Sequence, residues 1–327
     1  MTQALLADHD VPVTRTPDEP GTGPDTAFQP GSTSFRVGRG ALVAVLLIAY
    51  VVVLVAYAKS TQGAGINQRV APPDNGVSLH FVPMSLDASA ATMAGVMYVL
   101  PGTDYADESG RLQQDLTVHV LPVLGAGSVT YPAGQIPSPI NLLVSTSGNV
   151  RDYPFDHYTT SIVSSVETRS SPTSAWTPVP VVVGAEGELG GWALSLSTPD
   201  AAVIGGIDFR SADGYGIQGL EARRALSTIA LAFVLLLLMV LSAVMTAFVA
   251  RAVALQRRRV EPSLAGWMGA MLFALVPLRN FLPGAPPLGS WIDVLIFFWV
   301  EIVIMLALAV YIATWLRDGP PPDRSQV

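Results

Sequence analysis

The chain has 327 residues, of which 50% are apolar and only 13% are charged, with a net charge of −7. Soluble domains carry roughly 25% charged residues, so this composition favours a membrane protein. The acidic balance argues against a nucleic-acid partner, since no basic stripe is present to neutralise phosphates. The sequence contains no cysteine, which excludes disulfides, thiolate metal sites and cysteine nucleophiles.

The two ends of the chain have the composition of disordered tails. Residues 1–40 are rich in Pro, Gly, Thr and Asp, and residues 317–327 include three consecutive prolines. Such segments cannot bury enough apolar surface to offset the entropy lost on ordering. We therefore expect both to be disordered.

Four apolar stretches predict four transmembrane helices, at residues 41–58, 225–250, 264–282 and 292–316. A helix rises about 1.5 Å per residue, so a hydrocarbon core of about 30 Å requires roughly 20 apolar residues. The second and fourth stretches meet this length, while the first and third are shorter. Ala56-Tyr57-Ala58 has the spacing of a signal-peptidase site, which leaves cleavage as an alternative. The long leader and the apolar run of about 18 residues favour an uncleaved signal anchor.

Basic residues near the ends of the spans predict the orientation of the chain. If the chain crosses four times, nearly all fall on one side; they are Arg36, Arg39, Arg251, Arg257, Arg258, Arg259 and Arg317. The predicted protein is a multi-pass plasma-membrane protein with both termini and the basic loop 251–263 in the cytoplasm. Residues 59–224 and the Pro/Gly loop 283–291 then lie outside.

Residues 59–224 read as an extracytoplasmic β domain. Alternating or β-branched runs occur at residues 77–82, 116–120, 159–166, 179–183 and 192–197, and Gly and Pro clusters separate them. Several short strands at this spacing favour an antiparallel β-sandwich-like domain. The predicted fold class is therefore α+β, with four transmembrane helices and this domain.

The segment Tyr153-Pro154-Phe155-Asp156-His157-Tyr158 is the sharpest local feature of the β domain. Pro154 restricts its own backbone and that of Tyr153, while Asp156 can accept bonds from nearby amides. We interpret the segment as a structural corner with Phe155 anchored in the core. The alternative is a turn that presents these side chains to a partner.

This turn, Gly190-Gly191-Trp192 and the segment from Arg279 to Asp293 resemble an uncharacterised family of actinobacterial membrane proteins of unknown function. The resemblance implies one amino-terminal span, an extracytoplasmic β domain with a Pro-Phe-Asp turn, and three carboxy-terminal spans. It implies no activity.

Glu301 lies about 14 Å into the fourth predicted span, where an ionised carboxylate is disfavoured. One hypothesis makes Glu301 part of a proton or cation pathway, with Asp293 and Arg279, which we expect to reach each other, at its mouth. The other makes it a hydrogen bond that docks helices or a partner's span, and Ser242 and Thr246 are candidate partners. Transport pathways usually show several polar residues or broken helices, so docking is favoured.

The third predicted span carries a face of small residues, namely Gly266, Gly269, Ala270 and Ala274, which favours close packing between helices. The cluster Arg257-Arg258-Arg259 has two interpretations. It sets the topology of the chain, or it binds anionic lipid.

No catalytic signature, P-loop or zinc-binding His pair is present, so we expect no enzyme, cofactor or metal site. The four histidines are scattered, although His80 and His119 are candidates to face each other across strands. The predicted function is that of an accessory, sensor or scaffold subunit. Its expected partners are the lipid bilayer, an envelope or membrane protein, and a second copy of the chain. The alternative is a proton- or ion-coupled transporter or channel that uses Glu301.

Overall fold

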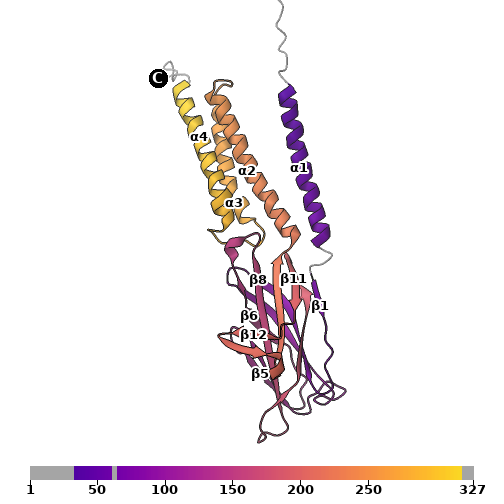
Figure 1. The fold of residues 1–327 in the computed structure, drawn as a ribbon. Coiled ribbons are helices and arrows are strands. Elements are labelled where there is room, and N and C mark those ends of the chain that lie inside the picture. Colours follow the sequence, from indigo (N-terminus) through magenta and orange to yellow (C-terminus); the bar gives the residue numbers. More distant parts are fainter. Residues whose placement is uncertain (1–32, 61–64, 319–327) are drawn as a thin grey trace, which may run out of the picture. The chain divides into compact units, whose positions relative to one another are not determined.

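The computed structural model describes residues 33–60 and 65–318. Helix α1 (Thr33–Ser60) begins in a unit that ends at Ile48 and is separate from the unit that holds the rest of the described chain. A β domain follows, and then α2 (Leu226–Ala254), α3 (Pro262–Asn280) and α4 (Phe298–Asp318), as Figure 1 shows. A π-helical turn, Asp293–Phe297, leads into α4.

The β domain is built from two larger sheets and one hairpin. The first sheet has the order β1 (Gly65–Gln68), β10 (Val181–Glu188), β2 (Val77–Asp87), β3 (Thr92–Pro101), β6 (Ile140–Ser145). The second has the order β11 (Trp192–Ser197), β14 (Gly216–Arg224), β8 (His157–Arg169), β4 (Asp115–Leu121), β5 (Ser128–Tyr131). The short strands β7 (Ser147–Gly148) and β9 (Thr177–Val179) pair with β8, while β12 (Ala201–Ile204) and β13 (Ile207–Arg210) form the hairpin.

The two sheets bury their facing side chains in one core. Phe81 and Met97 of the first sheet join Val118 and Ile162 of the second, all fully buried, as alternation along each strand requires. The sandwich-like prediction is therefore confirmed as an antiparallel-rich domain, but the expectation of purely antiparallel pairing is wrong. Strands β10 and β2 pair in parallel. About 100 residues separate them, so local alternation could not reveal their relative direction.

Two helical segments, Leu226–Ala254 and Asp293–Asp318, are long and apolar enough to cross a membrane, and a shorter apolar stretch, Ala44–Lys59, lies in α1. The described part of the chain thus shows two such helices where the sequence predicted four. The predicted span 264–282 corresponds to α3, whose 19 residues end at Asn280. The tails expected to be disordered lie mostly outside the described residues. Residues 33–40, however, are helical, because they continue the apolar helix α1 at its start.

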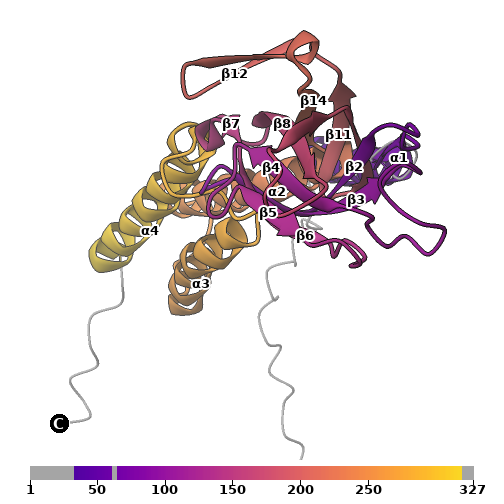
Figure 2. The ribbon, with the colours of Figure 1, turned by 90° about the horizontal axis from the view of Figure 1, so that it is seen from below.

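Helices α2, α3 and α4 pack against one another, and Figure 2 views them from the β-domain end. The buried residues of α3 are Met268, Leu275 and Arg279. The two glycines of the predicted small-residue face make no close contact with the described residues. A Cβ atom added at Gly266 or Gly269 would meet nothing within 4 Å. The buried apolar side chains of α3 are the neighbouring Met268 and Leu275.

Candidate functional site at the junction of strands and helices

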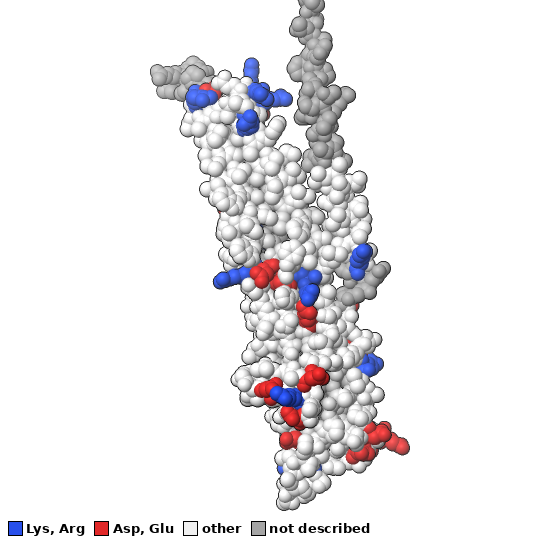
Figure 3. Space-filling view, viewed as in Figure 1, with Lys and Arg blue, Asp and Glu red and all other residues white. Residues whose placement is uncertain are grey.

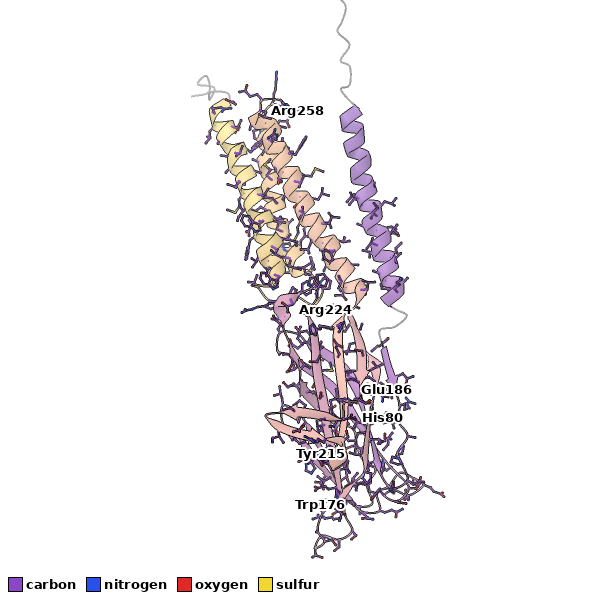
Figure 4. The ribbon with its side chains drawn as sticks, viewed as in Figure 1. His80, Trp176, Glu186, Tyr215, Arg224 and Arg258 are labelled. Carbon is purple, nitrogen blue, oxygen red and sulfur yellow. The ribbon has the colours of Figure 1, made fainter. Side chains whose placement is uncertain are left out.

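Arg224 ends the last strand of the β domain, and α2 begins two residues later. Its side chain is only 3% exposed and forms a fork on the fully buried Asp156. The Arg224 Nε and Nη2 atoms donate to Asp156 Oδ1 and Oδ2, each at 3.0 Å. Figure 4 shows Arg224 where the strands meet the helices. A paired, doubly hydrogen-bonded charge is the form in which arginine tolerates burial.

Two aromatic rings enclose the Arg224 guanidinium. Its central carbon lies 4.0 Å from the Trp192 ring centroid and 5.2 Å from that of Tyr153. Trp192 is the cross-strand partner of Arg224, and Tyr158 packs edge-on against it at 5.5 Å. The planar cation is therefore stabilised by ring faces as well as by the carboxylate.

The loop between α3 and α4 lies over the same guanidinium. A Cβ atom added at Gly284 would overlap Arg224, and the backbone of Gly284 has φ +79°. Only glycine meets both requirements without strain. The β domain's last arginine is thus covered by the helical part of the chain.

The first turn of α2 is also tied to the β domain. The Thr228 Oγ1 atom donates to the Gly191 carbonyl at 3.0 Å, and the Ala225 amide donates to the same oxygen at 2.9 Å. These bonds give partners to the Gly191 carbonyl and to the Ala225 amide at the start of the helix. They also fix the direction in which α2 leaves the strand.

A second buried ion pair joins the ends of α3 and α4. Arg279 Nε and Nη2 donate to Asp293 Oδ1 and Oδ2 at 3.1 and 3.0 Å, which confirms the expected contact between these residues. Asp293 also accepts from the Gly289 amide at 2.8 Å and from Ser290 Oγ at 3.2 Å. Asp293 is fully buried and therefore anchors the loop between α3 and α4 rather than facing water.

Tyr153 lies close to both arginines of the two ion pairs, Arg224 and Arg279. It packs with Leu282 and Ile292 in the core of the helices although it belongs to the β domain. Its hydroxyl is buried and has no hydrogen-bond partner among the described residues. Burial raises the pKa of Tyr153 to about 12, and the charges of Arg224 and Arg279 oppose this shift.

The predicted corner is present, but the side chains that it buries are not the expected ones. Tyr153, Pro154, Asp156 and Tyr158 are buried, which leaves Phe155 and His157 at the surface. The expectation that Phe155 anchors the core is wrong: it is 65% exposed and rests against Phe233 of α2, with centroids 6.1 Å apart. Tyr153 occupies the interior instead, because the helices supply an apolar pocket that the local sequence could not reveal.

The corner also borders an open cleft of about 330 Å³. The cleft is lined by Pro154, Phe155, Asp156, His157, Arg223, Arg224 and Ile229. Its arginines are engaged, Arg224 with Asp156 and Arg223 with Glu221. The cleft therefore offers Phe155 and His157 as its free contact groups.

Glu301 of α4 is half-buried and makes no side-chain hydrogen bond or ion pair with any residue that the structure describes. Ser242 and Thr246 are not its partners, because their hydroxyls donate to carbonyls of their own helix. His80 and His119 lie in different sheets, contrary to expectation. His80 bonds the Val70 carbonyl at 2.7 Å.

Arg224 was not predicted as a site residue; it is the last residue of the predicted domain 59–224. The available signal was a pair of arginines directly before an apolar helix, next to a β strand. Asp156 lies 68 residues earlier, so no local pattern linked the two.

Two matches to protein-family models divide the chain near this junction. Residues 67–210 match a domain of unknown function (DUF4436), and residues 224–318 match another domain of unknown function (DUF8686). No curated protein matches the chain. The protein therefore combines a β-rich and a helical domain, both of unknown function. Asp156 belongs to the first match and Arg224 to the second, so their ion pair crosses the boundary.

Proposed function

We propose that this chain is a non-catalytic plasma-membrane protein, an accessory, sensor or scaffold subunit that binds envelope partners through its β domain. In this proposal α1–α4 cross the membrane, the termini are cytoplasmic, and the β domain lies outside. The two apolar helices support a membrane location, and the basic α2–α3 loop supports this orientation.

The observation that carries the proposal is the buried Arg224–Asp156 pair. The pair lies within the β domain, and the Gly284 loop of the helical part covers it. This cover, the Thr228–Gly191 hydrogen bond and the packing of Tyr153 in the helical core join the β domain to α2–α4 and limit its independent movement. A domain held in this way presents its surface at a constant position above the membrane, which suits a scaffold or a sensor.

The hairpin β12–β13 is the candidate contact surface. One face packs on the domain, with Ala202 and Phe209 buried beside Val163. The open face carries two apolar side chains, Val203 at 71% exposed and Ile207 at 61% exposed, beside the ion pair of Asp208 and Arg210. An exposed apolar patch on a domain of this kind is a feature of protein interaction sites.

Crosslinking in the native membrane tests the proposal, because the cysteine-free sequence allows one thiol to be placed at will. Val203→Cys, carrying a photo-crosslinker, should capture one envelope or membrane protein reproducibly. Glu108→Cys, at another exposed site of the domain, is the control and should not capture it. Capture by Val203→Cys of lipid alone would contradict the accessory function, and capture of the chain itself would indicate a homo-oligomer.

One observation favours the second candidate, a proton- or ion-coupled transporter or channel. The π-helical turn Asp293–Phe297 lies about one helical turn before Glu301, and such turns are frequent at functional sites. Flux through proteoliposomes should then be lost in Glu301→Gln and retained in Glu108→Gln. Absence of flux with the unaltered protein would exclude this candidate.

A further inference from the structure

The loop between α2 and α3 is built to hold a defined backbone. The α2 helix ends with the Gln256 amide bonded to the Val253 carbonyl at 2.8 Å and the Arg257 amide to the Ala252 carbonyl at 3.0 Å. These two bonds form a Schellman motif, in which glycine is the usual residue at the left-handed position. Here Gln256 occupies it with φ +54°. A strained residue at this place suggests that its side chain is needed.

The far end of the loop is bonded to α4. The buried Tyr311 hydroxyl donates to the Glu261 carbonyl at 2.6 Å and accepts from the Glu261 amide at 2.9 Å. The loop is therefore held at both ends, and the arginines between them project from an ordered backbone.

One of the two acids beside these arginines, Asp318, is already occupied. Asp318 accepts from Arg317 Nε and Nη2 at 2.9 and 3.0 Å, and Gln256 Nε2 lies 3.4 Å from it. Arg258 and Arg259 form no ion pair or side-chain hydrogen bond within residues 33–60 and 65–318. Two positive charges are thus left available at one place.

Two clefts meet at Arg258 and Arg259, and both arginines line each of them. The larger, about 520 Å³, is completed by Phe248, Val249, Ala252, Val253, Glu261 and Leu264. The smaller, about 490 Å³, is completed by Val253, Gln256, Val260, Trp315 and Asp318. The larger cleft joins a cationic mouth to an apolar wall formed by α2 and the start of α3. Glu261 is the one acidic residue that lines the larger cleft, so the net charge of this cleft remains positive.

We propose that Arg258 and Arg259 bind the phosphate of an anionic phospholipid, whose acyl chain lies along the wall formed by Phe248, Val249 and Leu264. Arginine forks match phosphate oxygens, and basic pockets between membrane helices suit anionic headgroups. The apolar wall favours a lipid over free phosphate. The half-exposed Trp315 is a residue type that favours the level of the headgroups. This inference rests on the proposed membrane location of α2–α4.

Native mass spectrometry of the detergent-purified protein, mixed with phosphatidylglycerol or phosphatidylcholine, tests the site. The unaltered protein should retain phosphatidylglycerol in preference to phosphatidylcholine. Arg258→Gln and Arg259→Gln should each weaken this binding about fivefold, as expected for one basic residue at an anionic surface. Arg257→Gln is the matched control, since it removes an equal charge from the same loop but lines neither cleft; its binding should change less than twofold.

Equal loss in all three variants would show diffuse attraction and overturn the site, as would equal binding of the two lipids. Complete displacement of phosphatidylglycerol by millimolar inorganic phosphate would show that free phosphate occupies it. Alkaline carbonate extraction of native membranes tests the proposed function separately. Release of the unaltered chain by carbonate would reject the membrane location, whereas retention with no lipid preference would reject only the lipid site.

Discussion

The two ends of α2 use arginine in opposite ways. At the strand end, Arg224 is buried, paired with Asp156 and enclosed by aromatic rings. At the loop end, Arg258 and Arg259 are exposed and make no ion pair with the described residues. Figure 4 labels Arg224 and Arg258 at these ends, and Figure 3 shows the basic side chains gathered at the loop end. The same residue type is therefore part of a buried structural pair at one end and remains available to a ligand at the other.

The difference follows from desolvation. A buried charge must keep its partner, because leaving it alone is disfavoured by several kcal/mol. An exposed charge has no such requirement and contributes little through surface pairs. Substitutions at the strand end should therefore alter stability, and those at the loop end should alter binding.

The largest effect is expected from Arg224→Ala, which leaves the Asp156 carboxylate buried without its cation. The free energy of unfolding should fall by about 3–5 kcal/mol, measured by denaturant titration of the purified protein with tryptophan fluorescence. Arg69→Ala is the matched control, because Arg69 pairs with Glu186 at an exposed site and should cost at most about 1 kcal/mol. Equal losses in the two variants would contradict the structural role of Arg224.

A smaller effect is expected from Asp293→Asn, which removes the charge beside Arg279 but keeps the size of the side chain. The loss should be about 3 kcal/mol, because Gly289 and Ser290 retain a hydrogen-bond acceptor. The loop before α4 should also become sensitive to protease. The exposed Asp208→Asn, which loses its bond to Arg210, should leave protease sensitivity unchanged. Unaltered stability of Asp293→Asn would show that this pair does not anchor the loop.

Gly284→Ala tests the loop that covers the Arg224 guanidinium. The new methyl group would overlap the Arg224 guanidinium, and the left-handed backbone would be strained, so a loss of about 2 kcal/mol is expected. Gly289→Ala is the control, since its φ is +92° but nothing lies within 4 Å of the new atom. The free energy of unfolding of Gly289→Ala should fall by about 1 kcal/mol, from the strained backbone alone. A larger loss in Gly289→Ala would mean that the loop does not cover Arg224 tightly.

The smallest effect is expected from Tyr153→Phe. The Tyr153 hydroxyl is buried without a described partner, so its removal should change stability by less than about 1 kcal/mol near neutral pH. Tyr131→Phe is the control and should cost about 1 kcal/mol, because it loses a 2.6 Å bond to the Ser138 carbonyl.

The pH dependence of stability gives a second test of the burial of Tyr153. The pKa of Tyr153 is raised in the fold from about 10 to about 12, so its neutral form is favoured there. This contribution to stability is complete below about pH 10 and is lost as pH rises toward 12. Tyr153→Phe should therefore show a weaker alkaline loss of stability than the unaltered protein. The same alkaline profile in both would contradict the burial of this phenol.

Part of the candidate site was accessible from sequence. Arg279 and Asp293 are 14 residues apart across one predicted loop, and their contact was expected on that spacing. The corner at Tyr153–Tyr158 was also expected from Pro154 and Asp156. The burial of Tyr153 and the exposure of Phe155 were not, since the residues that pack with Tyr153 come from α2, α3, α4 and the segment between α3 and α4.

The long apolar helices α2 and α4 and the principal strands can be predicted from sequence, because hydrophobic runs and alternation are local properties that repeat with the period of each element. The gathering of basic residues in the α2–α3 loop is likewise visible in the sequence. Three features appear only in the fold: β10 lies parallel to β2, Asp156 pairs with Arg224, and Gly284 covers this pair. These contacts join segments far apart in the chain. Their stabilities depend on shared burial, which no local pattern records.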